Sequence, residues 1–338
     1  MAILVVSNKT SIVFGVQYLR GFAALSVVLC HFGSDLTKYP TLSAIFNFGQ
    51  NGVFIFFFIS GFIIVYSLQK ADYKPKQFIR FLLKRSIRID PSYIVTIICT
   101  ILLFNILSLM SSFKGQNIPL IPGQFLAHLF YIVPFTKYPF YNHIFWTLCV
   151  EFQFYILIGL LYFISSNKIY KAIFLILFSA TSLIPFANSY STVFHYAPIF
   201  SSGISMAGIY HKKHWINNVI PVFFLCLIYY EFGIGIFALL SISALVVIYA
   251  NDLFKPLFAL GEISYSLYLT HSLVNVVILG CLKRINVDIQ GNQLIWLIVQ
   301  VTLAIIFSTV FYYLIERPSL RISKRIFYNP INSTKPML

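Results

Sequence analysis

Long apolar runs follow one another along most of this chain, and they limit its possible folds more than any other feature. Ten runs reach or approach the length of a bilayer-crossing helix: 14–35, 48–69, 91–110, 144–164, 169–187, 193–210, 216–231, 233–250, 260–281 and 293–315. Each crossing needs about 20 apolar residues. We therefore expect an all-α polytopic membrane protein with about ten transmembrane helices. It should form a single membrane domain over residues 1–338, with no appended soluble domain.

The composition agrees with a membrane interior and excludes an ordinary soluble domain. Hydrophobic residues make up 59% of the chain and charged residues only 10%, against about 25% charged in soluble domains. The sequence shows no internal repeat, a feature of many secondary transporters. Its five cysteines are odd in number and form no CxxC pair. We therefore expect neither a disulfide framework nor a metal site.

The basic residues predict the orientation of the chain in the membrane. With ten spans and both termini cytoplasmic, 19 of the 24 Lys and Arg residues lie on the inside and 5 on the outside. This asymmetry follows the positive-inside rule. The net charge of +15 is thus explained by topology and by contact with anionic lipids, and we expect no nucleic-acid partner.

Two ionisable residues share one face of the first apolar run. Arg20 and His31 are eleven residues apart, which is close to three helical turns and roughly 16 Å along the axis. The spacing predicts an arginine at the membrane edge and a histidine near mid-depth. Ionisable groups inside a membrane are functional candidates by default.

A basic amphipathic helix is predicted on the cytoplasmic side before the third run. Lys76, Arg80, Lys84 and Arg88 recur every four residues, Arg85 lies beside them, and Pro91 is expected to stop the helix. Two interpretations remain open. The basic face can contact lipid phosphates, or Arg85 and Arg88 can bind a soluble polyphosphate through bidentate hydrogen bonds.

Two further runs carry polar residues. Glu151 lies inside the fourth run with Thr147 and Tyr155 one turn away on either side, and burial requires this carboxyl group to be paired or protonated. It can be a structural partner of a basic residue or a site residue. In the ninth run a polar stripe should face the bundle interior, for helix–helix hydrogen bonds or substrate contact. Its members are Ser264, Tyr268, His271 and Asn275.

Six segments together resemble the acyltransferase-3 family of integral-membrane O-acyltransferases. They occur in the expected order and cover about residues 16 to 320: Tyr18 to His31, Phe57 to Tyr66, Arg85 to Tyr93, Trp146 to Tyr155, Ser264 to His271 and Ile315 to Pro318. The resemblance implies transfer of an acyl group from cytoplasmic acyl-CoA to a hydroxyl of a surface or exported bacterial glycan. One departure is that Phe152 follows Glu151 where the family usually has a second acidic residue.

The resemblance and the chemistry of acyl transfer together assign roles to the candidate residues. Such a transfer needs a base for the hydroxyl proton and stabilisation of the developing oxyanion. We expect His31 and Glu151 to be catalytic, Arg20, Arg85 and Arg88 to hold the CoA phosphates, and Trp146, Tyr155 and His271 to line the substrate pocket. Direct transfer and a covalent acyl-His31 intermediate both remain open.

These expectations lead to a bacterial inner-membrane O-acetyltransferase with both termini cytoplasmic. Its partners would be acetyl-CoA as donor, a glycan or lipid-linked glycan as acceptor, and membrane lipids, without a metal. The alternative is a secondary transporter or flippase for a glycan-linked lipid. Such a protein would also have many spans and buried charge, but it would not need a base in register with a cytoplasmic arginine.

Overall fold

The protein is a bundle of helices, and no strand occurs in the segments that the structure describes. The computed structural model describes residues 13–109, 117–162, 168–185, 190–211, 215–252, 254–284 and 291–327. The helices are α1 (Phe14–Gly33), α2 (Pro40–Phe48), α3 (Gly52–Lys70), α4 (Phe78–Ser108), α5 (Pro122–Leu129), α6 (Trp146–Leu161), α7 (Lys168–Ala180), α8 (Ala197–His211), α9 (Trp215–Tyr249), α10 (Lys255–Glu262), α11 (Ser264–Arg284), α12 (Gln293–Phe311) and α13 (Arg317–Lys324).

The multi-pass, all-helical architecture predicted from the apolar runs is confirmed, and each of the ten runs overlaps a helix. Within the described residues, six helical stretches are long and apolar enough to cross a membrane, or seven if α10 and α11 count as one bent span. The apolar helix Ile169–Leu183 is shorter. The runs 216–231 and 233–250 both lie in α9, which is interrupted at Gly233, where φ is +81°.

Helix α1 occupies the centre of the bundle and packs against α3, α9, α10, α11 and α12. The crossing of α1 and α10 depends on two glycines. A Cβ atom on Gly21 would come within 2.5 Å of the Leu257 carbonyl oxygen, and one on Gly261 within 2.1 Å of the Gln17 carbonyl oxygen. Small residues let membrane helices approach closely. Gly21 therefore sets the position of its neighbour Arg20 against the α10–α11 bend.

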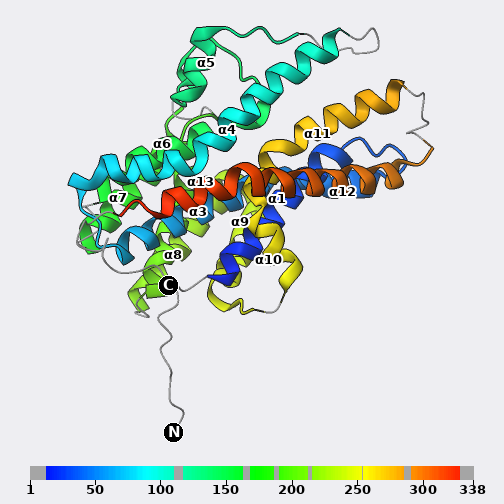
Figure 1. Cartoon of the computed structure of the whole chain (residues 1–338). Coiled ribbons are helices and arrows are strands. Elements are labelled where there is room, and N and C mark those ends of the chain that lie inside the picture. Colours follow the sequence, from blue (N-terminus) through cyan, green and yellow to red (C-terminus); the bar gives the residue numbers. More distant parts are fainter. Residues whose placement is uncertain are drawn as a thin grey trace.

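Helix α4 corrects one prediction, because it does not end at Pro91. It runs without a break from Phe78 to Ser108 with Pro91 inside it, so the basic segment and the third apolar run form one helix (cyan in Figure 1). A proline removes one backbone donor, which neighbouring helices can compensate within a membrane bundle. Close to this point Tyr265 of α11 donates a hydrogen bond to the Ile89 carbonyl oxygen over 3.0 Å.

The bend between α10 and α11 is the second feature that positions the site. The two helices meet at 73°, so α11 begins inside the bundle at Ser264. Glu316, 2% exposed, lies in the π-helical segment Tyr312–Glu316 between α12 and α13. Its carboxylate accepts hydrogen bonds from the backbone N–H and the hydroxyl of Ser266, in the first turn of α11. A carboxylate at this end complements the helix dipole.

Candidate active site

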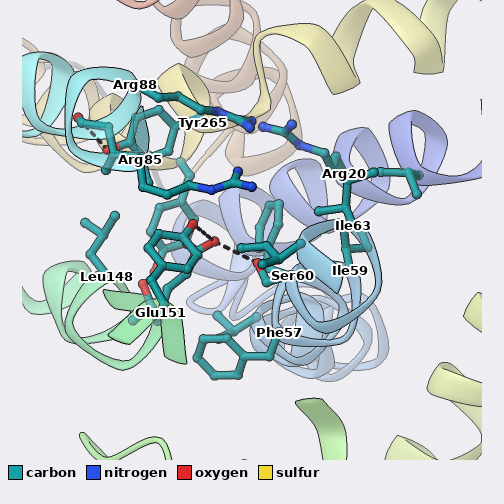
Figure 2. Close-up of a pocket in the computed structure, with 18 residues that line it drawn as sticks. Arg20, Phe57, Ile59, Ser60, Ile63, Arg85, Arg88, Leu148, Glu151 and Tyr265 are labelled. Carbon is teal, nitrogen blue, oxygen red and sulfur yellow. Dashed lines mark hydrogen bonds between the residues drawn. The ribbon is translucent and has the colours of Figure 1, made fainter. Parts of the chain in front are cut away.

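A cavity of about 140 Å³ opens between five helices in the middle of the bundle (Figure 2). Along α3 its lining extends from Val53 to Ile64, eleven residues or roughly 16 Å of helix. The cavity lining therefore extends along the helices over a large part of the thickness expected for a bilayer core. Its lining residues are Val16, Arg20, Val53, Phe56, Phe57, Ile59, Ser60, Ile63, Ile64, Arg85, Arg88, Ile89, Thr147, Leu148, Glu151, Tyr155, Tyr265 and Tyr268.

Three arginines from two helices converge on this cavity. Arg20 comes from α1, and Arg85 and Arg88 come from α4 one turn apart. Figure 2 shows the guanidinium groups of Arg20 and Arg88 directed toward each other, with Arg85 on the side of Glu151. Nε of Arg20 donates to the Ser264 hydroxyl over 3.1 Å. Within the described residues neither Arg20 nor Arg88 forms an ion pair with a carboxylate. The arrangement concentrates positive charge and suits an anionic ligand.

Aromatic rings and one serine hold Arg85 in place. Its guanidinium carbon lies 5.4 Å from the Phe81 ring centre and 5.7 Å from that of Tyr155, within the range of cation–π attraction. Nη2 donates to the Ser67 hydroxyl over 3.2 Å. Arg85 is only 8% exposed. Of the two interpretations of the basic segment, the structure excludes a mainly lipid-facing position for Arg85.

Glu151 lies on the cavity wall and accepts two hydrogen bonds at one carboxylate oxygen. The Ser60 hydroxyl donates to Oε1 over 2.7 Å, and the Tyr155 hydroxyl donates to the same atom. Among the described residues no donor reaches Oε2. Glu151 is thus paired through neutral hydroxyls, and its second oxygen remains able to act on a molecule in the cavity.

His31 and His271 form a pair that lies outside the cavity lining. Nδ1 of His31 is 2.7 Å from Nε2 of His271, and their rings stack with centres 4.9 Å apart. His271 is fully buried, whereas His31 is exposed. His31 lies in the last turn of α1, and its predicted position near mid-depth stays a prediction. The helix is only 20 residues long, so eleven residues beyond Arg20 reach its far end.

Tyr268 lines the cavity and also lies next to the histidine pair. Its hydroxyl oxygen lies 2.8 Å from that of Thr147 and donates to the Ile144 carbonyl oxygen over 3.0 Å. Its ring packs edge-on against Phe56 with centres 5.8 Å apart, and lies 6.1 Å from the His271 ring. Tyr268 thus links the cavity lining to the histidine pair.

The polar stripe on α11 faces the bundle interior, as predicted. Each member bonds to another helix or to the segment before α6: Ser264 to Arg20, Tyr268 to Thr147, His271 to His31, and Asn275 to Gln300. Helix–helix hydrogen bonding accounts for all four contacts. Ser264 and Tyr268 are in addition close to the cavity, and His271 contacts the candidate base.

The structure distributes the predicted substrate-pocket residues over three environments. Tyr155 lines the cavity, and His271 lies beyond Tyr268. Trp146 does not line the cavity but packs behind Phe57, which does, with ring centres 6.1 Å apart. It also stacks on Tyr196 over 5.7 Å. Trp146 thus supports the cavity wall from outside.

The sequence alone assigned no separate role to Ser60 or Glu316. Ser60 is 7% exposed and bonds to Glu151; its signal was a hydroxyl within an almost wholly apolar run. Glu316 is buried against α11, and the Ile315-Glu316-Arg317-Pro318 motif was its signal. Both depend on partners from helices that are distant in sequence.

Metal and disulfide chemistry find no support in the described segments. They contain no group of His, Cys, Asp and Glu side chains able to hold a metal ion. Cys30, Cys99, Cys149 and Cys226 are free thiols, while the side chain of Cys281 lies outside the described part of the structure. The polar groups that line the cavity are guanidinium, carboxylate and hydroxyl groups, and the imidazoles of His31 and His271 lie beyond Tyr268.

Comparison with known proteins identifies the family of the chain. A family model described as an acyltransferase domain, Acyl_transf_3, matches residues 13–316. No curated protein sequence and no solved structure matches the chain. The matched range begins one residue before α1 and ends at Glu316, so it contains every residue that lines the cavity.

Proposed function

The chain belongs to the acyltransferase-3 family of membrane acyltransferases, and on that premise we propose that it is an O-acetyltransferase of the bacterial inner membrane. It transfers an acetyl group from cytoplasmic acetyl-CoA to a hydroxyl of a cell-surface or exported polysaccharide or lipopolysaccharide. The acceptor can be a free glycan or a lipid-linked one.

The observation that carries this proposal is the convergence of three guanidinium groups on a cavity with mostly apolar walls. Coenzyme A combines phosphates with a long, largely uncharged pantetheine arm. Arg20, Arg85 and Arg88 match the phosphates, because guanidinium binds phosphate oxygens in a bidentate manner. The Phe, Ile and Leu side chains of the walls match the arm and a short acyl group.

The donor side is assigned from charge. The basic part of α4 and Arg20 lie on the side that the positive-inside rule assigns to the cytoplasm, where acyl-CoA is made. The opposite end of the cavity, at Val53, Thr147 and Tyr268, would then be the outer end, with His271 next to Tyr268 and His31 next to His271. The acceptor would approach from that face, so that the acyl group rather than the whole coenzyme crosses the bilayer.

His31 and Glu151 have different roles in the proposed reaction. His31 takes the proton from the acceptor hydroxyl, since imidazole is suited to general base catalysis near neutral pH. Glu151, fixed by Ser60 and Tyr155, orients the donor through its second oxygen. Direct transfer accounts for these positions with one chemical step. The two-step route through acyl-His31 uses the same imidazole nitrogen.

The proposal is tested with purified protein in proteoliposomes supplied with radiolabelled acetyl-CoA and a glycan acceptor. Glu151→Gln should lower transfer by roughly 10²-fold or more, as expected when a group that orients the substrate is lost. Glu231→Gln is the matched control. Glu231 also accepts a serine hydrogen bond over 2.7 Å, from Ser182, but it does not line the cavity, so transfer should persist.

The rival function has its own readout in the same vesicles. If the wild-type protein leaves acetyl-CoA intact but moves a labelled lipid-linked glycan across the bilayer, it is a flippase and the proposal is wrong. The glycans of a deletion strain, compared with the parent by mass spectrometry, identify the transferred group. Loss of the mass of one acetyl group supports acetyl transfer.

A further inference from the structure

The histidine pair at the outer end of α1 has hydrogen-bond partners on one side only. Nδ1 of His271 is 3.1 Å from the Leu267 carbonyl oxygen, and Nε2 of His271 is 2.7 Å from Nδ1 of His31. His271 is fully buried. Within the described residues, no partner is found for Nε2 of His31, which lies at the exposed side of the pair.

These contacts determine which nitrogen of each ring carries a proton. A carbonyl oxygen only accepts hydrogen bonds, so Nδ1 of His271 must be protonated. A neutral His271 then has a lone pair on Nε2, and Nδ1–H of His31 must donate to it. Neutral His31 is left with a lone pair on Nε2. The assignment follows from the hydrogen-bond network.

We propose that His271 is a positioning residue that holds His31 in the Nδ1–H tautomer, with the Nε2 lone pair presented to the acceptor hydroxyl. The inference rests on the proposed function for its catalytic meaning. The tautomer itself rests only on the geometry of the pair. Without such a partner, the Nε2–H tautomer of histidine predominates in water, and that form has no lone pair on the exposed nitrogen.

The transfer step balances with His31 as base and then acid. The acceptor hydroxyl gives its proton to Nε2 of His31 while its oxygen bonds to the thioester carbonyl carbon. The carbon–sulfur bond breaks with its electron pair on sulfur, and Nε2–H returns the proton to that sulfur. The products are the ester and free CoA. While His31 is cationic, its Nδ1–H donates to the neutral Nε2 of His271, which stabilises the charge.

His128 provides an internal comparison for this role. It is also fully buried, and its Nδ1 bonds to the carbonyl oxygen four residues earlier, Gln124, over 2.9 Å. His271 makes the same local contact with Leu267. The two differ at Nε2, which in His128 accepts a backbone hydrogen bond from Tyr141 over 3.2 Å. Only His271 directs its Nε2 at another imidazole.

Activity measurements separate positioning from mere packing. His271→Leu fills the site but accepts no hydrogen bond, and kcat should fall by roughly 10²-fold or more, because a wrong histidine tautomer costs a serine protease about 10⁴-fold. The KM for acyl-CoA should stay within about threefold of wild type, because the arginines are unchanged. His271→Gln supplies an amide oxygen to Nδ1–H and should recover kcat to within about tenfold of wild type. The matched control Asn275→Leu removes a helix–helix hydrogen bond from the same stripe of α11, the one to Gln300, and should leave kcat unchanged.

Nitrogen-15 NMR of histidine-labelled protein tests the tautomer without any turnover. The His31 signal, identified by its loss in His31→Gln, should report a protonated Nδ1 and a bare Nε2 in the wild type. In His271→Leu it should shift toward the Nε2–H form. A wild-type His31 protonated at Nε2, or a tautomer unaffected by His271→Leu, overturns the inference. If the tautomer shifts as expected but wild-type protein shows no acyl transfer, the proposed function fails while the pairing stands.

Discussion

At the scale of single residues, the site combines groups that are costly to bury and are held by neutral partners. Arg20 bonds to Ser264, Arg85 to Ser67, and Glu151 to Ser60 and Tyr155. Serine and tyrosine hydroxyls lower the cost of burial without neutralising the charges. The charges therefore remain effective toward a ligand, which strong internal ion pairs would prevent.

The arginine assignment gives a prediction at this scale. Arg88→Ala should raise the KM for acyl-CoA by roughly 10- to 100-fold, the effect of losing about 1.5–3 kcal/mol of charged hydrogen bonding. Arg88→Lys should recover only part of this, because lysine lacks the bidentate fork. The control is Arg80→Ala, two turns earlier on α4 and exposed. Titration of the purified variants with acyl-CoA measures both. Equal effects of the Arg80 and Arg88 substitutions would mean that the basic face only contacts lipid.

At the scale of elements, the buried His128 connects a short helix by hydrogen bonds to the loop that leads into α6. His128 of α5 accepts the backbone N–H of Tyr141 and donates to the Gln124 carbonyl oxygen. Tyr141 stacks on the His128 ring with centres 4.6 Å apart. The loop continues through Asn142, which donates to Ser272 of α11 over 2.7 Å. Fixing this loop fixes the start of α6, and with it Thr147 and Glu151.

The stability that the His128 contacts give to this loop should depend on pH. Burial lowers the pKa of His128 below its ordinary value of 6.5, although the bond to Gln124 opposes the shift. The folded state therefore contains the neutral ring. The contribution of this ring to stability is complete above about pH 6.5. As the pH falls below that value the unfolded segment gains a proton first, so the stability of the loop decreases.

Hydrogen exchange measures this effect at one amide. After correction for the intrinsic exchange rate, protection of the Tyr141 amide should decrease between about pH 7.5 and 5.5, the interval that contains the ordinary histidine pKa. The Ile132 amide, which donates to the Ala127 carbonyl oxygen over 2.9 Å, is the control and should change less. His128→Gln should abolish the difference. Equal pH dependence at the two amides in the wild type would contradict the interpretation.

At the scale of the whole molecule, the cavity lining extends from Arg85 and Arg88 of α4 to Tyr268, which lies next to the histidine pair. A donor bound at the arginines and an acceptor near His31 would then lie on opposite sides of the membrane. This arrangement requires the amino-terminal part of α4 to be cytoplasmic and the segment before α5 to be external.

Cysteine accessibility tests that orientation. In a background with all five native cysteines replaced, Lys76→Cys and Asn117→Cys introduce thiols at two exposed positions. Position 76 should react with an impermeant reagent only in inverted vesicles, and position 117 only in right-side-out vesicles. Detergent-solubilised protein, in which both should react, is the control. The reverse pattern would place the arginines outside and remove the route by which a cytoplasmic thioester reaches His31.

The sequence by itself determined the helices and the identity of the chemical groups. A helix length near the bilayer thickness and the 3.6-residue period are local properties, so the ten runs, the inward-facing stripe on α11 and the half-buried Glu151 could be recognised without a partner. The family resemblance arose from the same local motifs. Pro91 was misjudged, because a proline's local effect was weighed without the packing that keeps α4 continuous.

Only the tertiary structure decided which of these groups meet. Arg20 bonds to Ser264 across 244 positions of the chain, and His31 to His271 across 240. Such contacts depend on how helices pack, and the small residues that set the crossings, such as Gly21 and Gly261, carry no signal of their partners. For the same reason the sequence could not tell a lipid-facing Arg85 from one inside a cavity. Both positions are compatible with the same 3.6-residue helical period, and only the neighbouring helices distinguish them.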